Sequence, residues 1–203
     1  MSQRIIARSD IASTLFDHPA YKVGNWYDTA AFGTIAGAPA APGANNMRLV
    51  PFFVRSTITL NSLGLRVQTL SAGGNVQVAI YASNPATGLP TGFPLASTAS
   101  MSTAAVGSVN AAVSVQLTEG WYWFATNCDN AVAVFAATNV GNCYLGWLMG
   151  SATQGTALAS TQSFAGYNVA QTFGTWPDLT PSSPTEVTNA SVPIGQFKVG
   201  SIP

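Results

Sequence analysis

The residue types that carry out catalysis are scarce in this chain. Its only histidine, His18, stands beside Pro19 close to the N-terminus, so a Ser-His-Asp triad cannot be assembled within the rest of the chain. Hydrolysis of a glycosidic bond needs two carboxyl groups that flank the bond. The acidic residues beyond position 47 stand in turn-like segments where a solvated side chain is expected: Glu119, Asp129, Asp178 and Glu186. The sequence therefore predicts a protein that is not an enzyme.

Metal and cofactor sites lack suitable residues as well. Cys128 and Cys143 together with one histidine fall short of the four ligands of a structural zinc site, and the acids form no calcium-loop motif. Gly73 and Gly74 lack the flanking motif of a phosphate-binding loop. We therefore expect no metal and no cofactor. We expect both cysteines to be reduced and buried, because no secretory signal precedes them; a disulfide between neighbouring strands is the alternative.

Sugar binding is a chemistry for which suitable residues are present. Saccharide sites combine exposed aromatic faces with nearby carboxylate and amide groups. Such residues occur together in the irregular part that follows residue 140, where the candidates for binding a glycan are Trp147, Tyr167, Trp176 and Asp178. Most aromatic residues are buried for packing, so we favour the alternative in which these rings close the ends of the fold or line an oligomer axis.

The elements that would position these residues carry very little charge. Charged residues make up 7% of the chain, against about 25% in an average soluble domain, and none lies between Val67 and Thr118. The net charge is zero and the seven basic residues are scattered, which argues against nucleic-acid binding. No apolar run is long enough to insert into a membrane. An uncharged surface does not repel further copies of itself, so it favours assembly.

Composition divides the chain into three parts. Residues 1–28 hold six of the fourteen charges and form a predicted N-terminal arm. Residues 29–46 are a Gly/Ala/Pro-rich linker or loop, and residues 47–203 form the main domain. A short helix over residues 11–16 is predicted in the arm, whose apolar residues favour docking on a partner over a frayed end. The candidate anchor residues for this docking are Ile5, Ile6, Ile11, Leu15 and Phe16.

Alternating apolar and polar residues indicate β-strands in the main domain. Residues 75–82 alternate cleanly, whereas the apolar parity of residues 57–69 reverses near Asn61 and Ser62, which predicts a β-bulge or a bend. Roughly eight short strands with turn signals about every 8–12 residues are typical of an all-β sandwich. We therefore predict an antiparallel β-sandwich with a jelly-roll arrangement of strands.

The segment Trp121–Thr126, WYWFAT, is apolar on both faces. One face can pack in the core, and the other needs a loop, the arm or a neighbouring subunit as cover. Two alternatives are therefore open for its aromatic residues, the core of the domain and an oligomer interface. The candidate residues for such an interface are Trp121, Tyr122, Trp123 and Phe124.

Three segments together resemble a known family. They are Arg48–Thr69 (RLVPFFVRSTITLNSLGLRVQT), Val76–Leu95 (VQVAIYASNPATGLPTGFPL) and Leu117–Asn127 (LTEGWYWFATN). Their order is an extended strand, a strand ending in Ile-Tyr, a loop with Gly-Leu-Pro, and a strand with Gly-aromatic-Tyr-Trp. This order is similar to the small jelly-roll domains of tailed-bacteriophage virion proteins, which include tail fibres, minor tail proteins, head fibres and decoration proteins. The resemblance covers about residues 26–202 and includes no catalytic motif.

The resemblance implies a virion structural protein, assembled in the host cytoplasm, commonly a homotrimer and in some members in contact with the host surface. Because the domain makes up most of the chain, we expect a compact spike, decoration or adaptor part rather than a long fibre. The N-terminal arm would hold it to capsid or tail proteins. The alternative function is a carbohydrate-binding or receptor-binding module that acts through aromatic residues in its loops.

Overall fold

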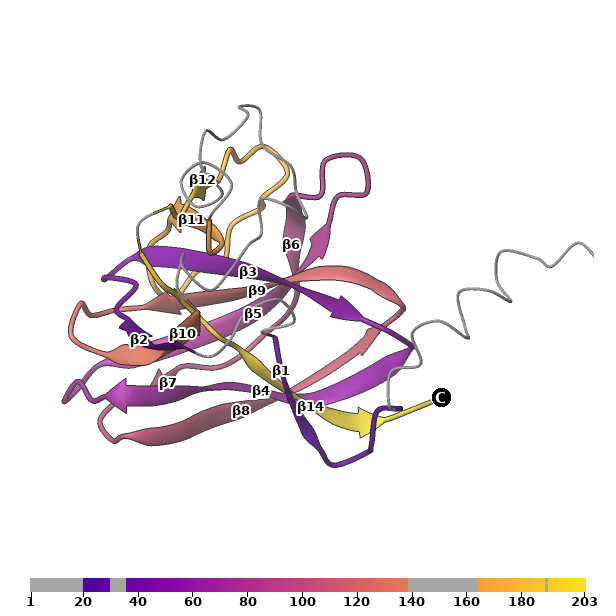
Figure 1. The fold of residues 1–203 in the computed structure, drawn as a ribbon, viewed down its shortest axis with the longest axis horizontal. Helices are drawn as coiled ribbons and strands as arrows, with labels where there is room; N and C mark the ends of the chain where they lie inside the picture. The colour runs from indigo at the N-terminus through magenta and orange to yellow at the C-terminus, as the bar shows by residue number, and fades with distance from the viewer. Residues whose placement is uncertain (1–19, 30–35, 139–163, 189) are drawn as a thin grey trace, which may run out of the picture.

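The computed structural model describes residues 20–29, 36–138, 164–188 and 190–203. Within these ranges the chain forms strands, turns and loops, arranged as two sheets that pack face to face (Figure 1). Every strand pairing in both sheets is antiparallel, so the predicted antiparallel β-sandwich is confirmed, and its jelly-roll strand order stays a prediction. The described residues contain no helix that is long and apolar enough to cross a membrane.

The first sheet has seven strands among the described residues. They are β1 (Trp26–Asp28), β2 (Ala36–Ala40), β4 (Ile58–Thr69), β8 (Gly107–Leu117), β10 (Val134–Thr138), β13 (Val192–Pro193) and β14 (Gln196–Ser201). The order is β1-β14-β4-β10-β13, with β2 also on β10. Strand β8 pairs with the other side of β4 and is an edge strand among the strands that the structure describes.

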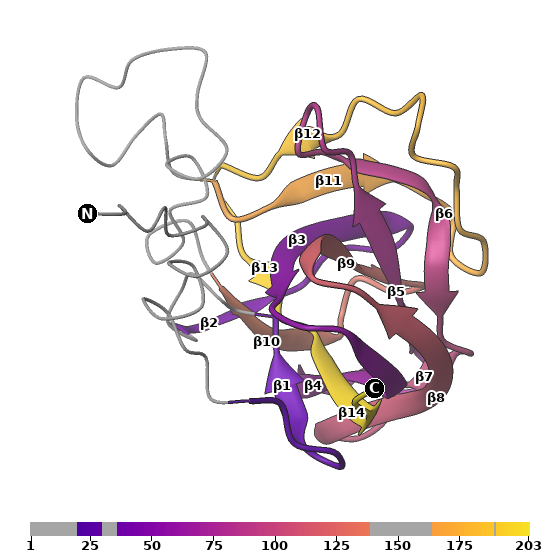
Figure 2. The same ribbon diagram turned by 90° about the vertical axis from the view of Figure 1, so that its right-hand side faces the viewer.

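The second sheet also has seven strands in the described ranges. They are β3 (Asn46–Val54), β5 (Asn75–Ser83), β6 (Pro90–Ser97), β7 (Met101–Ser102), β9 (Gly120–Cys128), β11 (Tyr167–Ala170) and β12 (Thr185–Glu186). The order is β12-β11-β3-β9-β5-β6, with β7 also on β5. Turned by 90°, the molecule shows β11 and β12 at one end of this sheet and β6 at the other (Figure 2).

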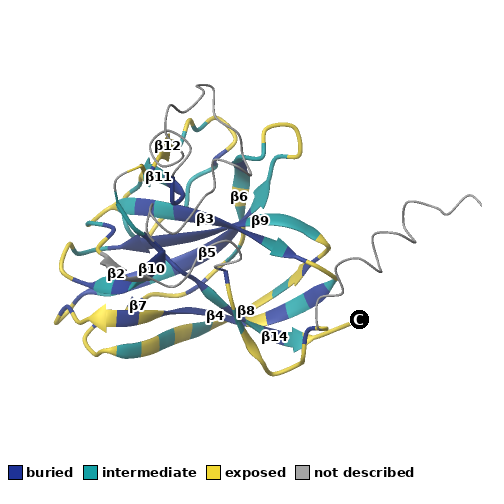
Figure 3. Cartoon of the chain, viewed as in Figure 1, coloured by how far each residue is buried: buried dark blue, intermediate teal, exposed yellow. Residues whose placement is uncertain are grey.

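The core lies between the two sheets. Buried residues follow β3, β9 and β5 on one side and β4 on the other (Figure 3). Phe52 and Phe197 pack across the sandwich with ring centroids 5.6 Å apart, and a Cβ added at Gly195 would lie 2.3 Å from the ring of Phe124. Each fully buried side chain of this size stabilises the fold by roughly 1.5–3 kcal/mol relative to its exposed state.

The predicted bulge in β4 is confirmed. In the pairing of β4 with β14, Leu60 pairs with Val199 and Ser62 with Lys198, so Asn61 is the additional residue on β4. Asn61 is exposed, while the residues on both sides of it are buried. Because one additional residue is accommodated there, Leu60 and Leu63 both reach the core although they have opposite parity.

The boundary of the N-terminal arm differs from the prediction. Strand β1 pairs with β14, and the buried Tyr21 ring meets Tyr27 with centroids 5.0 Å apart, so Tyr21 and residues 26–28 belong to the sandwich. Likewise, β2 lies within the predicted linker and pairs with β10. Strands this short, or as rich in glycine, alanine and proline, lack the alternation that identifies a strand in a sequence. The helix predicted over residues 11–16 lies outside the described residues.

Candidate functional site

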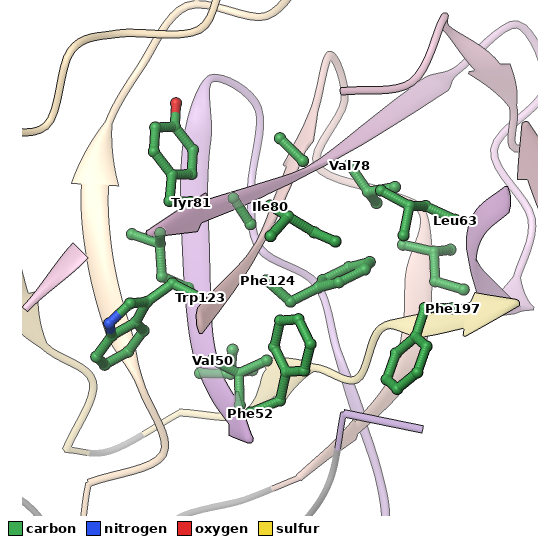
Figure 4. Packing of buried hydrophobic residues seen from close by; sticks show 14 of the residues in the cluster. Val50, Phe52, Leu63, Val78, Ile80, Tyr81, Trp123, Phe124 and Phe197 are labelled. Carbon is green, nitrogen blue, oxygen red and sulfur yellow. The ribbon is translucent and has the colours of Figure 1, made fainter. Parts of the chain in front are cut away.

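Strand β9 has a second apolar face, which points away from the first sheet. Side chains alternate along a strand, so Trp121 and Trp123 share this outer face while Tyr122 and Phe124 point toward the core. Figure 4 shows Trp123 and Tyr81 on the side of the strands opposite Phe124. The second sheet therefore presents apolar side chains on both faces.

The C-terminal segment of the same chain covers part of this outer face. Tyr167 packs against Trp123 with ring centroids 5.3 Å apart, and Trp176 meets Tyr81 edge-on at 6.3 Å. The Tyr81 hydroxyl donates a hydrogen bond of 3.1 Å to the Pro177 carbonyl, and burial raises the pKa of this phenol, which keeps it a donor. Of the covers that the sequence allowed for WYWFAT, a loop of the same chain lies over Trp123.

Beside this cover, the outer face is hollowed into a groove of about 560 Å³. Its volume lies in the range of small-molecule binding sites. The groove is lined by Pro51 of β3, by residues between 82 and 88 at the end of β5 and in the loop that follows, and by residues 119–123 at the start of β9. These three segments are distant in sequence and meet because β9 pairs with both β3 and β5.

Hydrogen bonds fix the loop that forms one wall of the groove. The Gly88 N–H donates to the Asn84 carbonyl (2.7 Å), and the Asn84 N–H donates to the Leu89 carbonyl (2.8 Å). The Gly88 carbonyl accepts from Trp123 Nε1 and from Ser83 Oγ, both at 3.0 Å. The φ of Gly88 is 73°, a conformation that glycine adopts without strain. The wall is thus attached to the sheet by its own backbone and side chains.

The groove combines an aromatic surface with polar groups. The half-buried Trp121 ring meets Phe53 with centroids 5.2 Å apart and an interplanar angle of 60°. Asn84 Oδ1 accepts the Ala86 N–H (2.9 Å), which leaves the side-chain amide nitrogen of Asn84 as a donor. Among the described residues that line the groove, Glu119 alone is charged. An indole face, an amide and a carboxylate on one surface can bind a ligand with many hydroxyl groups.

The residues that the sequence predicted for sugar binding lie elsewhere. Tyr167 is buried and Trp176 is half-buried, and their ring contacts show that both cover the second sheet. Asp178 Oδ1 accepts the Thr180 N–H (2.8 Å), and the hydrogen bonds from Thr180 lower the pKa of this carboxyl group. Trp147 lies outside the described residues.

The four candidate residues for an oligomer interface differ in how far they are buried. Trp123 and Phe124 are 1% and 0% exposed within a single chain, which agrees with the core location that the sequence also allowed for them. Trp121 and Tyr122 are half-buried and line the groove. The candidate anchors lie outside the described residues: Ile5, Ile6, Ile11, Leu15 and Phe16.

Asp129 has a structural role. Its carboxylate accepts hydrogen bonds from the Asn75 N–H (2.7 Å), from Asn75 Nδ2 (2.8 Å) and from Asn130 Nδ2 (2.9 Å). Partial burial raises the pKa of this carboxyl group, but the hydrogen bonds from Asn130 and Asn75 outweigh it, and the pKa is lowered. This arrangement agrees with the turn role that the sequence indicated.

Metal-binding groups are not gathered in the described part of the chain, where no three His, Cys, Asp or Glu side chains come together. Cys128 is a buried free thiol, as predicted, and its Sγ donates to the carbonyls of Gly43 (3.3 Å) and Asn130 (3.1 Å). Burial raises the pKa of the Cys128 thiol to about 11. Cys143 lies outside the described residues.

Sequence reasoning did not identify Asn84 or Glu119 as site residues. One signal was present, because Glu119 stands two residues before Trp121, and Asn84 opens a loop rich in proline and glycine. That signal was not sufficient, since the loop and the start of β9 meet only when the strand order is known.

Comparison of the chain with protein-family models and with curated proteins finds no match to either. Function is therefore inferred from the surfaces of this chain.

Proposed function

We propose that this protein is a structural component of a bacteriophage particle, of the head-fibre, decoration, spike or tail-fibre type, and that it self-associates through an edge of its first sheet. The resemblance of three segments to phage jelly-roll domains supports this class of protein. A charged fraction of 7% supports association, because little repulsion opposes contact between copies. An antiparallel β-sandwich is compatible with the proposal.

The observation that carries self-association is the edge position of β8 among the described strands of the first sheet. Among the described strands, β8 pairs only with β4, and its residues 107–112 run in continuous register. This segment contains no charged residue and no proline, although edge strands of soluble proteins commonly use Lys, Pro or short length to prevent pairing with other chains. Its unpaired backbone groups can add a strand from a second copy, with small or polar outward side chains that allow close approach: Ser108, Asn110 and Ala112.

Light scattering on a sizing column at physiological salt tests self-association. A trimer has a mass near three times 20.9 kDa, and a double variant with Asn110→Lys and Ala112→Lys is expected to shift the mass to that of one chain. The matched control places the same two charges on exposed residues away from this edge, with Ala131→Lys and Thr172→Lys, and is expected to remain associated. A monomeric wild-type protein contradicts self-association.

The proposed docking arm can be tested by truncation. Tyr21 and β1 belong to the sandwich, so the deletion should remove residues 2–19 and keep everything from Ala20 onward. The truncated protein is expected to fold and associate like the full chain but to be missing from purified particles. Immunogold labelling of particles that contain the full chain should be positive. Absence of label on particles made with the full chain contradicts the role in the particle. Normal incorporation of the truncated protein contradicts the anchoring role of the arm.

A further inference from the structure

We propose that the groove beside Trp121 binds a neutral saccharide, with a pyranose ring stacked on the indole. This inference goes beyond the proposed role in particle structure and does not depend on it, because it rests on the outer face of the second sheet alone. The groove is about 560 Å³, which accommodates a ligand the size of a disaccharide.

The aromatic surface matches one face of a sugar ring. Pyranose C–H groups carry a small positive charge and pack on the negative face of an indole, and they make up much of the apolar surface of an otherwise polar molecule. Trp121 and Pro51 are neighbours on the outer face, since Pro51 pairs with Trp123 and Phe53 pairs with Trp121. The edge-to-face contact with Phe53 helps hold the Trp121 ring in position.

The polar groups of the groove match the hydroxyls at the edge of a sugar ring. The side-chain amide nitrogen of Asn84 can donate, while the Glu119 carboxylate can accept two hydroxyl hydrogens. Ser83 Oγ donates to the Gly88 carbonyl, so its lone pairs remain available as acceptors. Sugars need this mixture of donors and acceptors, because each hydroxyl is both.

The charge of the groove restricts the kind of sugar. Glu119 is acidic, and no Lys, Arg or His is among the lining residues that the structure describes. A uronic acid, a sialic acid or a phosphorylated sugar would place a second negative charge next to Glu119 without a cation to compensate, which is unfavourable. A neutral hexose or N-acetylhexosamine avoids this repulsion.

The loop wall reduces the cost of binding. Trp123 Nε1 and Ser83 Oγ both bond to Gly88, and the Asn84 side chain bonds to the Ala86 N–H within the same loop. Loops that are already ordered lose little conformational entropy when a ligand arrives. The site is therefore largely preformed.

Titration of the full chain with lactose, cellobiose and N,N′-diacetylchitobiose, followed by NMR of the indole N–H signals, tests the proposal. At least one sugar is expected to bind with Kd on the order of 1 mM and to shift the Trp121 signal. Trp121→Ala should raise Kd by about tenfold or more, and Glu119→Gln by severalfold. Sialyllactose, which adds one carboxylate to lactose, should bind more weakly than lactose.

The matched control is Trp26→Ala, which removes an exposed tryptophan from the first sheet and should leave Kd unchanged. The proposal is overturned if none of the three sugars shifts the Trp121 signal. It is also overturned if Trp121→Ala binds as well as wild type, or if Trp26→Ala weakens binding as much as Trp121→Ala does. A folded spectrum for each variant separates lost binding from lost structure.

Discussion

Two tryptophans that stand two residues apart on the same face of β9 have different surroundings. Trp123 is 1% exposed, lies under Tyr167, and bonds through Nε1 to the Gly88 carbonyl. Trp121 is half-buried at the groove, where Phe53 is its ring neighbour. The strand and the residue type are the same, and among the described segments it is Tyr167 that packs on Trp123, while Trp121 lines the groove. Residue type therefore indicates an apolar surface, and only the tertiary cover separates a packing role from a binding role.

The covered region amounts to a second small core on the outer face of the sheet. Its members come from β5, β9 and the segment that contains β11, and they are Tyr81, Trp123, Phe164, Tyr167, Trp176 and Leu179. Removing a side chain from this region opens a cavity, whereas removing one from the groove enlarges a space that water already reaches. The two regions should therefore respond differently to the same substitution.

The largest difference is expected between Trp123→Ala and Trp121→Ala. Trp123→Ala should lower the free energy of unfolding by about 3–5 kcal/mol, because it removes a buried ring and leaves a cavity under Tyr167. Trp121→Ala should cost about 1 kcal/mol, since its ring is half-buried. Urea unfolding followed by circular dichroism measures both. Equal losses would show that the groove region packs as tightly as the covered region.

A smaller difference is expected between two glycines with nearly the same φ. Gly166, beside β11, has φ 158°, and a Cβ there would lie 2.2 Å from the Leu49 carbonyl oxygen. Gly120, in the groove, has φ 155°, and a Cβ there would meet no atom within 4 Å. The backbone cost of alanine is therefore similar at both positions, about 1 kcal/mol. Gly166→Ala should cost about 2 kcal/mol more in urea unfolding, because strand β3 must shift. Equal losses of unfolding free energy for the two alanine variants would mean that the segment around Gly166 can shift away from β3 at little cost.

The sequence predicted the long strands well. Residues 75–82 alternate clearly, and the reversed parity near Asn61 identified the bulge in β4, because one sheet face is buried and register is then strongly specified. Strands β1 and β2 were not predicted. They have three and five residues and take their conformation from their partners β14 and β10 rather than from an apolar pattern of their own.

The site was less predictable than the fold. The pattern WYWFAT indicated two apolar faces, but it could not distinguish a loop, the arm or a second subunit as the cover. Trp176 was predicted to bind sugar because it stands in an irregular segment, and this segment is the one that covers the outer face of the second sheet. Asn84 and Glu119 were not predicted as site residues because a single polar residue in a turn is usually solvated. Only the pairing of β5 with β9 brings these two residues to the same groove.

The hydrogen bond from Tyr81 to Pro177 gives a pH-dependent measure of the cover. Tyr81→Phe should lower the free energy of unfolding by about 1 kcal/mol at neutral pH, because the Pro177 carbonyl loses its donor. Burial, with a contribution from the charge of Asp178, raises the pKa of Tyr81 above its usual value of about 10. The advantage of tyrosine over phenylalanine is thus complete below about pH 10 and should shrink as the pH rises further. Urea unfolding of both proteins at pH 7 and pH 11 tests this; a difference that does not change with pH would contradict the buried phenol.

The smallest effects are expected for Asp178 in the covering segment and Asn84 in the groove wall. Each of these side chains accepts a hydrogen bond from the backbone N–H two residues later in the chain. Asp178 accepts the Thr180 N–H at 2.8 Å, and Asn84 accepts the Ala86 N–H at 2.9 Å. Asn84→Ala should cost about 0.5 kcal/mol at every pH, because an amide does not titrate in this range. Asp178→Ala should lower Tm at pH 7. The difference in Tm should disappear as the pH falls below about 4 and then through the lowered pKa of Asp178, because the wild-type carboxyl group becomes protonated and accepts the hydrogen bond more weakly. Thermal unfolding of wild type and both variants at pH 7 and pH 2.5 distinguishes these patterns. A pH-dependent loss for Asn84→Ala would mean that the groove wall depends on a titrating neighbour, and Glu119 is the one acid that lines it among the described residues.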